Sequence, residues 1–274
     1  MPWFPDFTNA AELARRWLRV DGHADPGAAY LTALERRDTR DLEVIWPGEV
    51  VVHDPVAGEV RGHRALRQFV HRSGRWLDER RAQTERIACT VADGRAVLEL
   101  LAHLDDDGRR VTWPVAVVAE ADGDRSVVFR TYCSRRPVDG RHHIRPPVLA
   151  GGNDPPGGAV GRLLAALAVG DADAVVAEFA PEAYVREPDA SDHTRLPAYF
   201  ARCFSGGGSV VLRDCATTDD GARCALEYTC VRWGDRDLPP EAGLMVCERD
   251  ARDRLAAVRL YDDIERPARV ESAS

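Results

Sequence analysis

Two acid–proline pairs are the residues of this sequence best suited to proton transfer. The stretch VVHDPVAGEVRGH (51–63) carries Asp54 directly after a β-branched run, and YVREP (184–188) carries Glu187 in the same position. A carboxylate at a strand end beside an apolar cavity loses hydration, which raises its pKa toward neutrality and allows it to shuttle protons. The following proline fixes φ and removes a backbone N–H, so the acid is held at a defined turn. The alternative is an Asx turn without a catalytic role, which is common before proline.

The residue types present exclude several cofactor-dependent chemistries. All 37 residues counted as lysine or arginine are arginine, so a Schiff base, a pyridoxal phosphate linkage and a P-loop are excluded, because each needs a lysine. The adjacent His142 and His143 cannot face the same way on a regular element and have no partner at metal-ligand spacing, so no metal site is expected. We therefore expect chemistry without a cofactor. The arginine bias also indicates a GC-rich, actinobacterial genome.

The composition indicates a cytoplasmic globular protein. The net charge is −8 with both signs interleaved, so neither nucleic acid nor a membrane surface is an expected partner. No apolar run approaches the ~20 residues that span a bilayer, and the N-terminal residues do not resemble a signal peptide. The seven cysteines form no CxxC pair and lie mostly in apolar runs, which is typical of reduced, buried thiols.

The chain contains an internal repeat. The segment LTALERRDTRDLEVIWPGEVVVHDP (31–55) aligns without gaps with LAALAVGDADAVVAEFAPEAYVREP (164–188), and later blocks follow in the same order. A Pro- and Gly-rich stretch separates the copies and is typical of a linker. We therefore expect an N-terminal helical extension (1–25), a first domain (26–135), a linker (136–158), a second domain (159–267) and a short tail (268–274).

Each repeat has the same predicted order of elements, with helices first and strands afterwards. Apolar residues at helical spacing predict a first helix, and Asp38 or Asp171 is placed to cap a short second one. A short strand then ends at Asp54 or Glu187. This order predicts an α+β fold with helices on one face of a curved antiparallel sheet. The remaining elements are expected at 62–78 or 194–204 for a third helix and at 84–92, 95–105, 110–120 and 125–134 for the strands of repeat one.

The segments YLTALERRD (30–38) and VVVHDPVAGEVRGHRALRQF (50–69) resemble the SnoaL-like and ketosteroid isomerase-like branch of the nuclear transport factor 2-like superfamily. The resemblance extends over both repeats. It implies a curved antiparallel sheet wrapped by helices around a conical cavity, where a ligand pocket forms. Members are commonly dimers, so it also implies an intramolecular pseudo-dimer, and further homodimerisation is left open.

The resemblance also implies roles for single residues. Asp54 takes the place of the general base in repeat one, and Glu187 takes it in repeat two. Tyr30 takes the place of the tyrosine that stabilises an oxyanion, whereas repeat two has Leu163 there. The second oxyanion acid of the isomerases falls on Ala116, so the full steroid-isomerising set is absent.

Other polar and aromatic residues are candidates for the cavity wall. The chain is also similar to two-domain polyether epoxide hydrolase/cyclases, which use a carboxylate pair in each domain, and Glu79, Glu85 and Glu99 are open candidates for the second acid. The alternative for many of these positions is a solvated face or cross-strand pairing. The predicted substrate-binding residues are His53, Glu99, His103, Trp113, Arg130, Tyr132, Tyr261 and Asp263.

Two functions are carried forward from the sequence. The first is a cofactor-independent acid–base enzyme, an isomerase or a cyclase that includes epoxide-opening cyclisation, acting on an apolar oxygenated small molecule of natural-product metabolism. The second is a non-catalytic small-molecule-binding or scaffolding protein of the same fold. They differ in geometry, since the enzyme requires Asp54 to be buried toward a cavity.

Overall fold

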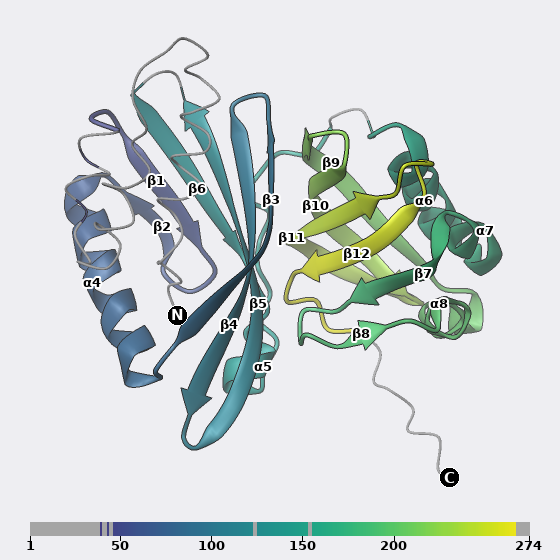
Figure 1. Cartoon of the computed structure of the whole chain (residues 1–274), viewed down its shortest axis with the longest axis horizontal. Helices are drawn as coiled ribbons and strands as arrows, with labels where there is room; N and C mark the ends of the chain where they lie inside the picture. Colours follow the sequence, from purple (N-terminus) through teal and green to yellow (C-terminus); the bar gives the residue numbers. More distant parts are fainter. Residues whose placement is uncertain (1–38, 40–42, 44–45, 123–124, 153–154, 267–274) are drawn as a thin grey trace. The chain divides into compact units, whose positions relative to one another are not determined.

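The chain forms two compact units in the computed structural model, and the first consists of the residues up to Cys133 together with Thr218–Asp220 (Figure 1). None of the seven cysteines, all of which lie in the described part, forms a disulfide. No helix among the described residues is long and apolar enough to cross a membrane. Tyr30 and the predicted N-terminal helices lie outside the described residues. The structure describes residues 39, 43, 46–122, 125–152 and 155–266.

The first unit contains a six-stranded mixed sheet in the order β2-β1-β6-β5-β4-β3. Five of its strands lie close to their predicted ranges, whereas β2, which forms a hairpin with β1, was expected only as a turn. The sheet is also not wholly antiparallel, because β1 pairs in parallel with β6. A helix and a meander separate these two strands, and such a long connection is what parallel neighbours need. The strands are β1 (Val50–Asp54), β2 (Gly58–Arg61), β3 (Gln83–Ala92), β4 (Arg95–Asp106), β5 (Arg109–Asp122) and β6 (Ser126–Tyr132).

The second unit repeats this topology strand for strand, which confirms the tandem repeat. Its sheet has the order β8-β7-β12-β11-β10-β9, and β12 again pairs in parallel with β7. The predicted acid–proline strand is present, but β7 ends one residue before Glu187. The strands are β7 (Phe179–Arg186), β8 (Asp192–His193), β9 (Ser209–Asp219), β10 (Arg223–Gly234), β11 (Arg236–Arg249) and β12 (Leu255–Tyr261).

The helices lie against one face of each sheet (Figure 1). In the first unit, α4 (His63–Glu79) buries one apolar stripe, and its Trp76 meets Trp113 of β5 edge to face at 5.9 Å. In the second unit, Asp171 accepts a hydrogen bond of 2.9 Å from the backbone N–H of Ala174, which confirms the predicted cap. The helices of the second unit are α6 (Gly158–Val169), α7 (Ala172–Ala177) and α8 (Leu196–Cys203).

The segment between the repeats is held against the second unit. It begins with the short helix α5 (Arg136–Asp139), and farther on the carbonyl of Arg145 accepts a hydrogen bond of 2.8 Å from the backbone of Ala242. Gly152 donates to the carbonyl of Asp214 at 3.0 Å. The predicted linker is therefore part of the second unit, because its backbone groups find partners there.

Candidate functional site

Asp54 lies on the helix-covered face of the first sheet. Trp113 marks this face, because it contacts Trp76 of α4. Side chains alternate along β5, so Ala119 lies on the same face and pairs with Phe129 of β6, which in turn pairs with Val52 of β1. Asp54 follows Val52 by two residues and therefore points to the same side.

The two carboxylate oxygens of Asp54 have different surroundings. The residue is 4% exposed, and its Oδ1 accepts hydrogen bonds from the backbone N–H groups of Val56 at 2.8 Å and Ala57 at 2.7 Å. Its Oδ2 is buried and has no hydrogen-bond partner among the described residues. The predicted Asx turn is therefore present, and one oxygen remains for other chemistry. The pairing of Asp54 with Tyr30 stays a prediction.

Most of the predicted cavity residues of the first unit lie on the opposite face. His53 is adjacent to Asp54 on β1 and pairs with Arg130 of β6, so both point away from α4. Glu99 pairs with Ala116, which pairs with Tyr132, and His103 lies four residues beyond Glu99 on β4. The structure does not bring these side chains to Asp54, because strand alternation separates them. Of the predicted set in this unit, it places only Trp113 on the same face as Asp54.

The interactions of these residues are those of a structural face. The guanidinium of Arg130 pairs with Glu120 at 2.8 Å, and Arg95 pairs with the same carboxylate at 2.8 Å. Burial alone would raise the pKa of Glu120, but the two arginines outweigh it and lower the pKa. Of the candidates for a second acid, Glu85 lies 3.7 Å from His103 and Glu79 is exposed at the end of α4. Neither joins Asp54.

A polar hollow in the first unit lies apart from Asp54. It has a volume of about 180 Å³, and His53 lines it together with Glu49, Arg61 and Asp122. Arg61 is already paired with Glu49 at 2.7 Å and with Glu59 at 2.8 Å. The hollow is therefore a charged surface feature and does not contribute to a site around Asp54.

Glu187 of the second unit lies within a network of side chains. The hydroxyl of Tyr199 donates to its Oε1 at 3.3 Å, and Nε2 of His193 lies 3.3 Å from its Oε2. Burial would raise the pKa of Glu187, but His193, Tyr199 and the charge of Arg266 hold it at about 2. The alternative to a catalytic role for Glu187 is a turn or a salt bridge with Arg186 or Arg195, and a salt bridge is close to what is observed. The partner is His193, since Arg186 instead pairs with Asp192 at 2.7 Å.

Asp262, which together with Asp263 is expected from the sequence to offer a second acid for this unit, is the stronger functional candidate of the two. Its side chain is fully buried, and its Oδ2 accepts hydrogen bonds from Tyr228 at 2.6 Å and from Arg266 at 2.8 Å. The predicted Asp263 points elsewhere and holds the linker, accepting from the hydroxyl of Ser134 at 2.7 Å. Alternation along β12 from the buried Leu260 is the sequence signal that would have selected Asp262.

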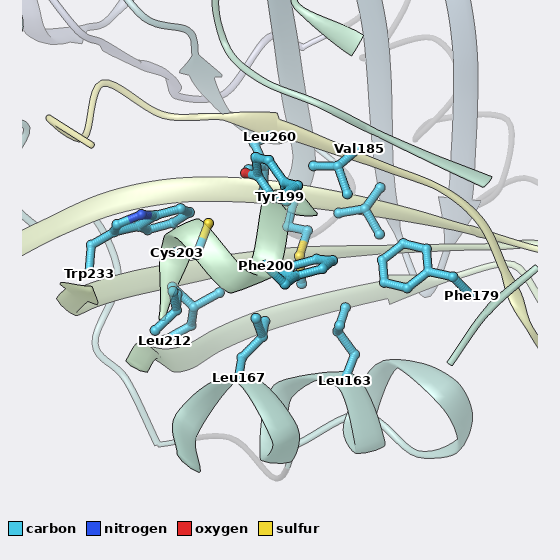
Figure 2. A pocket seen from close by; sticks show the side chains of 13 residues that line it. Leu163, Leu167, Phe179, Val185, Tyr199, Phe200, Cys203, Leu212, Trp233 and Leu260 are labelled. Carbon is cyan, nitrogen blue, oxygen red and sulfur yellow. The ribbon is translucent and has the colours of Figure 1, made fainter. Parts of the chain in front are cut away.

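The second unit encloses an apolar cavity beside this network. Figure 2 shows Leu163 and Leu167 pointing from α6 toward the rings of α8 and β7. The space open to the centre of a water molecule is only about 30 Å³, which is room for about two water molecules. Tyr261, another predicted site residue, lies outside this cavity. The wall is formed by Leu163, Leu167, Phe179, Val185, Tyr199, Phe200, Cys203, Val210, Leu212, Trp233, Met245, Val258 and Leu260.

Glu241 of β11 is a buried carboxyl group close to other carboxyl groups of the second unit. It is 5% exposed, and burial together with the charges of Asp262, Asp263 and Glu265 raises its pKa to about 7. The folded chain then keeps a proton that the unfolded chain has lost, so stability falls as pH rises from the ordinary pKa of about 4.3 through about 7.

Glu241→Gln is expected to remove this pH-dependent loss of stability. The unfolding free energy should rise by about 1–3 kcal/mol at pH 8 and change little at pH 5, where Glu241 is already protonated in the folded state. Urea unfolding at both pH values measures this. Glu182→Gln on the exposed side of β7 is the matched control. Equal effects of Glu241→Gln at the two pH values would contradict the assignment.

The described residues contain no group of three or more His, Cys, Asp or Glu side chains that could hold a metal ion. The candidate site of the first unit rests on Asp54 and the helix-covered face of the sheet on which it lies.

Comparisons with known proteins show what the first unit is similar to. Residues 28–129 match the family model described as a SnoaL-like domain. No curated protein matches the chain. A putative polyketide cyclase from Sinorhizobium meliloti is 20% identical over 37% of this chain and 92% of its own, with a TM-score of 0.32. An NTF2-like protein of unknown function from Cytophaga hutchinsonii is 12% identical over 38% of this chain and 87% of its own, also at 0.32.

Proposed function

Because residues 28–129 match the model of a SnoaL-like domain, we propose that the first unit is a cofactor-independent acid–base enzyme. Its substrate would be an apolar, oxygenated small molecule of natural-product metabolism, and its reaction an isomerisation or a cyclisation, including the opening of an epoxide. The observation that carries the proposal is that the two carboxylate oxygens of Asp54 have different surroundings. One oxygen is fixed by two backbone N–H groups, and the other is buried without a partner among the described residues.

This geometry suits a base that must take up a proton and give it back. The two hydrogen bonds to Oδ1 orient the carboxylate, so Oδ2 is presented toward the helix-covered face in a fixed position. A proton taken from a carbon next to a carbonyl, or from a hydroxyl that attacks an epoxide, would reside on Oδ2 and then return to the product. The negative charge that develops on the substrate oxygen needs a donor, and Tyr30 is the proposed one.

A second function, small-molecule binding without turnover, is favoured by the hydrogen bonds that Oδ1 of Asp54 accepts. The hydrogen bonds from Val56 and Ala57 to Oδ1 of Asp54 account structurally for an acid before a proline. A binding protein would keep the turn and the apolar face without using Oδ2 as a base.

Proton exchange distinguishes the two functions and does not require the natural substrate. The protein would be incubated in D2O and EDTA with a panel of apolar ketones and epoxy alcohols, followed by mass spectrometry and NMR. The enzyme should introduce deuterium next to a carbonyl or form a cyclic product in the absence of any cofactor. Binding of panel members without exchange or product would favour the second function.

A further inference from the structure

The segment that follows β12 returns to the network of the second unit. Ile264 is fully buried, its backbone N–H donates to Oδ1 of Asp262 at 3.1 Å, and Arg236 donates to the carbonyl of Glu265 at 2.8 Å. Arg266 follows, and its side chain is 14% exposed. Its positive charge is thus placed inside the unit rather than in solvent.

Arg266 interacts with one carboxylate and one aromatic ring. Its guanidinium donates to Oδ2 of Asp262 at 2.8 Å and lies over the ring of Trp233, with 4.4 Å between the guanidinium carbon and the ring centroid. A cation over the face of a tryptophan is attracted by the π-electrons, most strongly where water is excluded. Its Nε is buried and has no hydrogen-bond partner among the described residues. The site therefore balances the charge of Arg266 but does not provide hydrogen-bond acceptors for all of its N–H donors.

Three carboxyl groups belong to this region, where the guanidinium of Arg266 pairs with Asp262 and the imidazole of His193 lies 3.3 Å from Glu187. Arg266 donates to Asp262 at 2.8 Å, and its positive charge helps to lower the pKa of Glu187. Glu241 adds a third carboxyl, whose charge Asp262 opposes. Anionic groups in a buried site create a strong preference for a positive ligand.

Apolar space adjoins the charged end of the site. Trp233, which carries Arg266 on its ring, also belongs to the wall of the apolar cavity, together with Tyr199 and Cys203. A ligand with a positive head and a hydrocarbon body would match both parts, because the head replaces a guanidinium and the body meets leucine and phenylalanine side chains.

We propose that the second unit contains a binding site for an apolar organic cation, such as an alkylammonium, and that Arg266 occupies this site from within the chain. In this autoinhibitory contact Arg266 takes the position of the ligand's positive head beside Trp233 and Asp262, and displacement of Arg266 frees that position. The proposal does not depend on whether Asp54 is a catalytic base, because the two sites lie in different units.

The full chain with Arg266→Ala provides the test. Calorimetric titration with n-butylammonium should give a dissociation constant at least about ten-fold lower than in the unaltered protein, whereas the neutral n-butanol should bind neither form. In the double variant Arg266→Ala with Asp262→Asn, the dissociation constant of n-butylammonium should rise again by about ten-fold. The second change removes the carboxylate that pairs with the ligand. Arg232→Ala, which removes an exposed arginine paired with Asp237, is the matched control and should bind as the unaltered protein does.

Equal affinity for n-butylammonium and n-butanol, or no gain on Arg266→Ala, would overturn the proposal and leave Arg266 as a structural anchor. Should Arg266→Ala not fold alone, circular dichroism is recorded with each compound added. Recovery of the folded signal with n-butylammonium and not with n-butanol supports the site, and recovery with neither overturns it.

Discussion

Replacement of Asp54 by asparagine is expected to reduce turnover by about 10²–10⁴-fold while the first unit stays folded. The amide oxygen can continue to accept from the backbone N–H groups of Val56 and Ala57, so the turn is preserved. The amide nitrogen then takes the place of Oδ2, where it has no basic lone pair and cannot accept the substrate proton. The rate of deuterium incorporation or product formation measures the loss, and thermal unfolding verifies the fold.

Glu187→Gln is the matched control, because Glu187 is the corresponding acid–proline carboxyl of the other unit. It is already engaged by Tyr199 and His193, so turnover should be unchanged within about two-fold in this variant. Turnover that survives Asp54→Asn and is lost in Glu187→Gln would transfer the proposed activity to the second unit. Turnover that survives both would remove the acid–proline pairs from the mechanism.

Local patterns were sufficient to predict most of the elements. The strand that ends at Asp54, the cap at Asp171 and the helix that begins at His63 each depend on residues near one another in the sequence. Such signals act within a few residues and survive in any tertiary setting. The repeat then extended each prediction from one unit to the other, and the shared strand order confirms that extension.

The face on which each side chain lies was harder to predict. Alternation correctly groups Glu99 with His103, but β4 is buried on both faces over most of its length, so hydrophobicity does not show which face the helices cover. The sequence likewise does not show that Arg130 and Tyr132 lie on the face opposite Asp54, since both are almost fully buried. The contact between Trp76 and Trp113 was needed to identify the face of the sheet that the helix covers.

The charged network of the second unit could not be predicted from the sequence for a different reason. Its members come from the turn after β7, from α8, from β10 and from the segment after β12, and nothing in their spacing brings them together. Only the pairing of β12 with β7 and β11 places Asp262, Glu187 and Arg266 in one region. Their long-range electrostatics therefore follow from the topology.

Gly243→Ala is expected to destabilise the second unit by about 3 kcal/mol, the upper end of what overpacking usually costs. A Cβ at Gly243 would lie 2.5 Å from two ring carbons of Tyr228 and 2.6 Å from its hydroxyl. Tyr228 is 2% exposed, and its hydroxyl donates to Asp262 at 2.6 Å, so the ring cannot move without breaking that bond. Urea unfolding of the full chain, followed by tryptophan fluorescence, measures the change.

Two further variants separate this clash from a general effect of adding a methyl group. A Cβ at Gly157 would meet no atom within 4 Å, so Gly157→Ala should change the unfolding free energy by less than about 0.5 kcal/mol. Tyr228→Ala removes the ring that the new methyl group strikes. Combined with Gly243→Ala, it should therefore destabilise by clearly less than the sum of the two single changes. Strict additivity would show that Gly243 is not needed for the close approach of Tyr228, and with it the fixed position of Asp262 beside Arg266 would lose its structural basis.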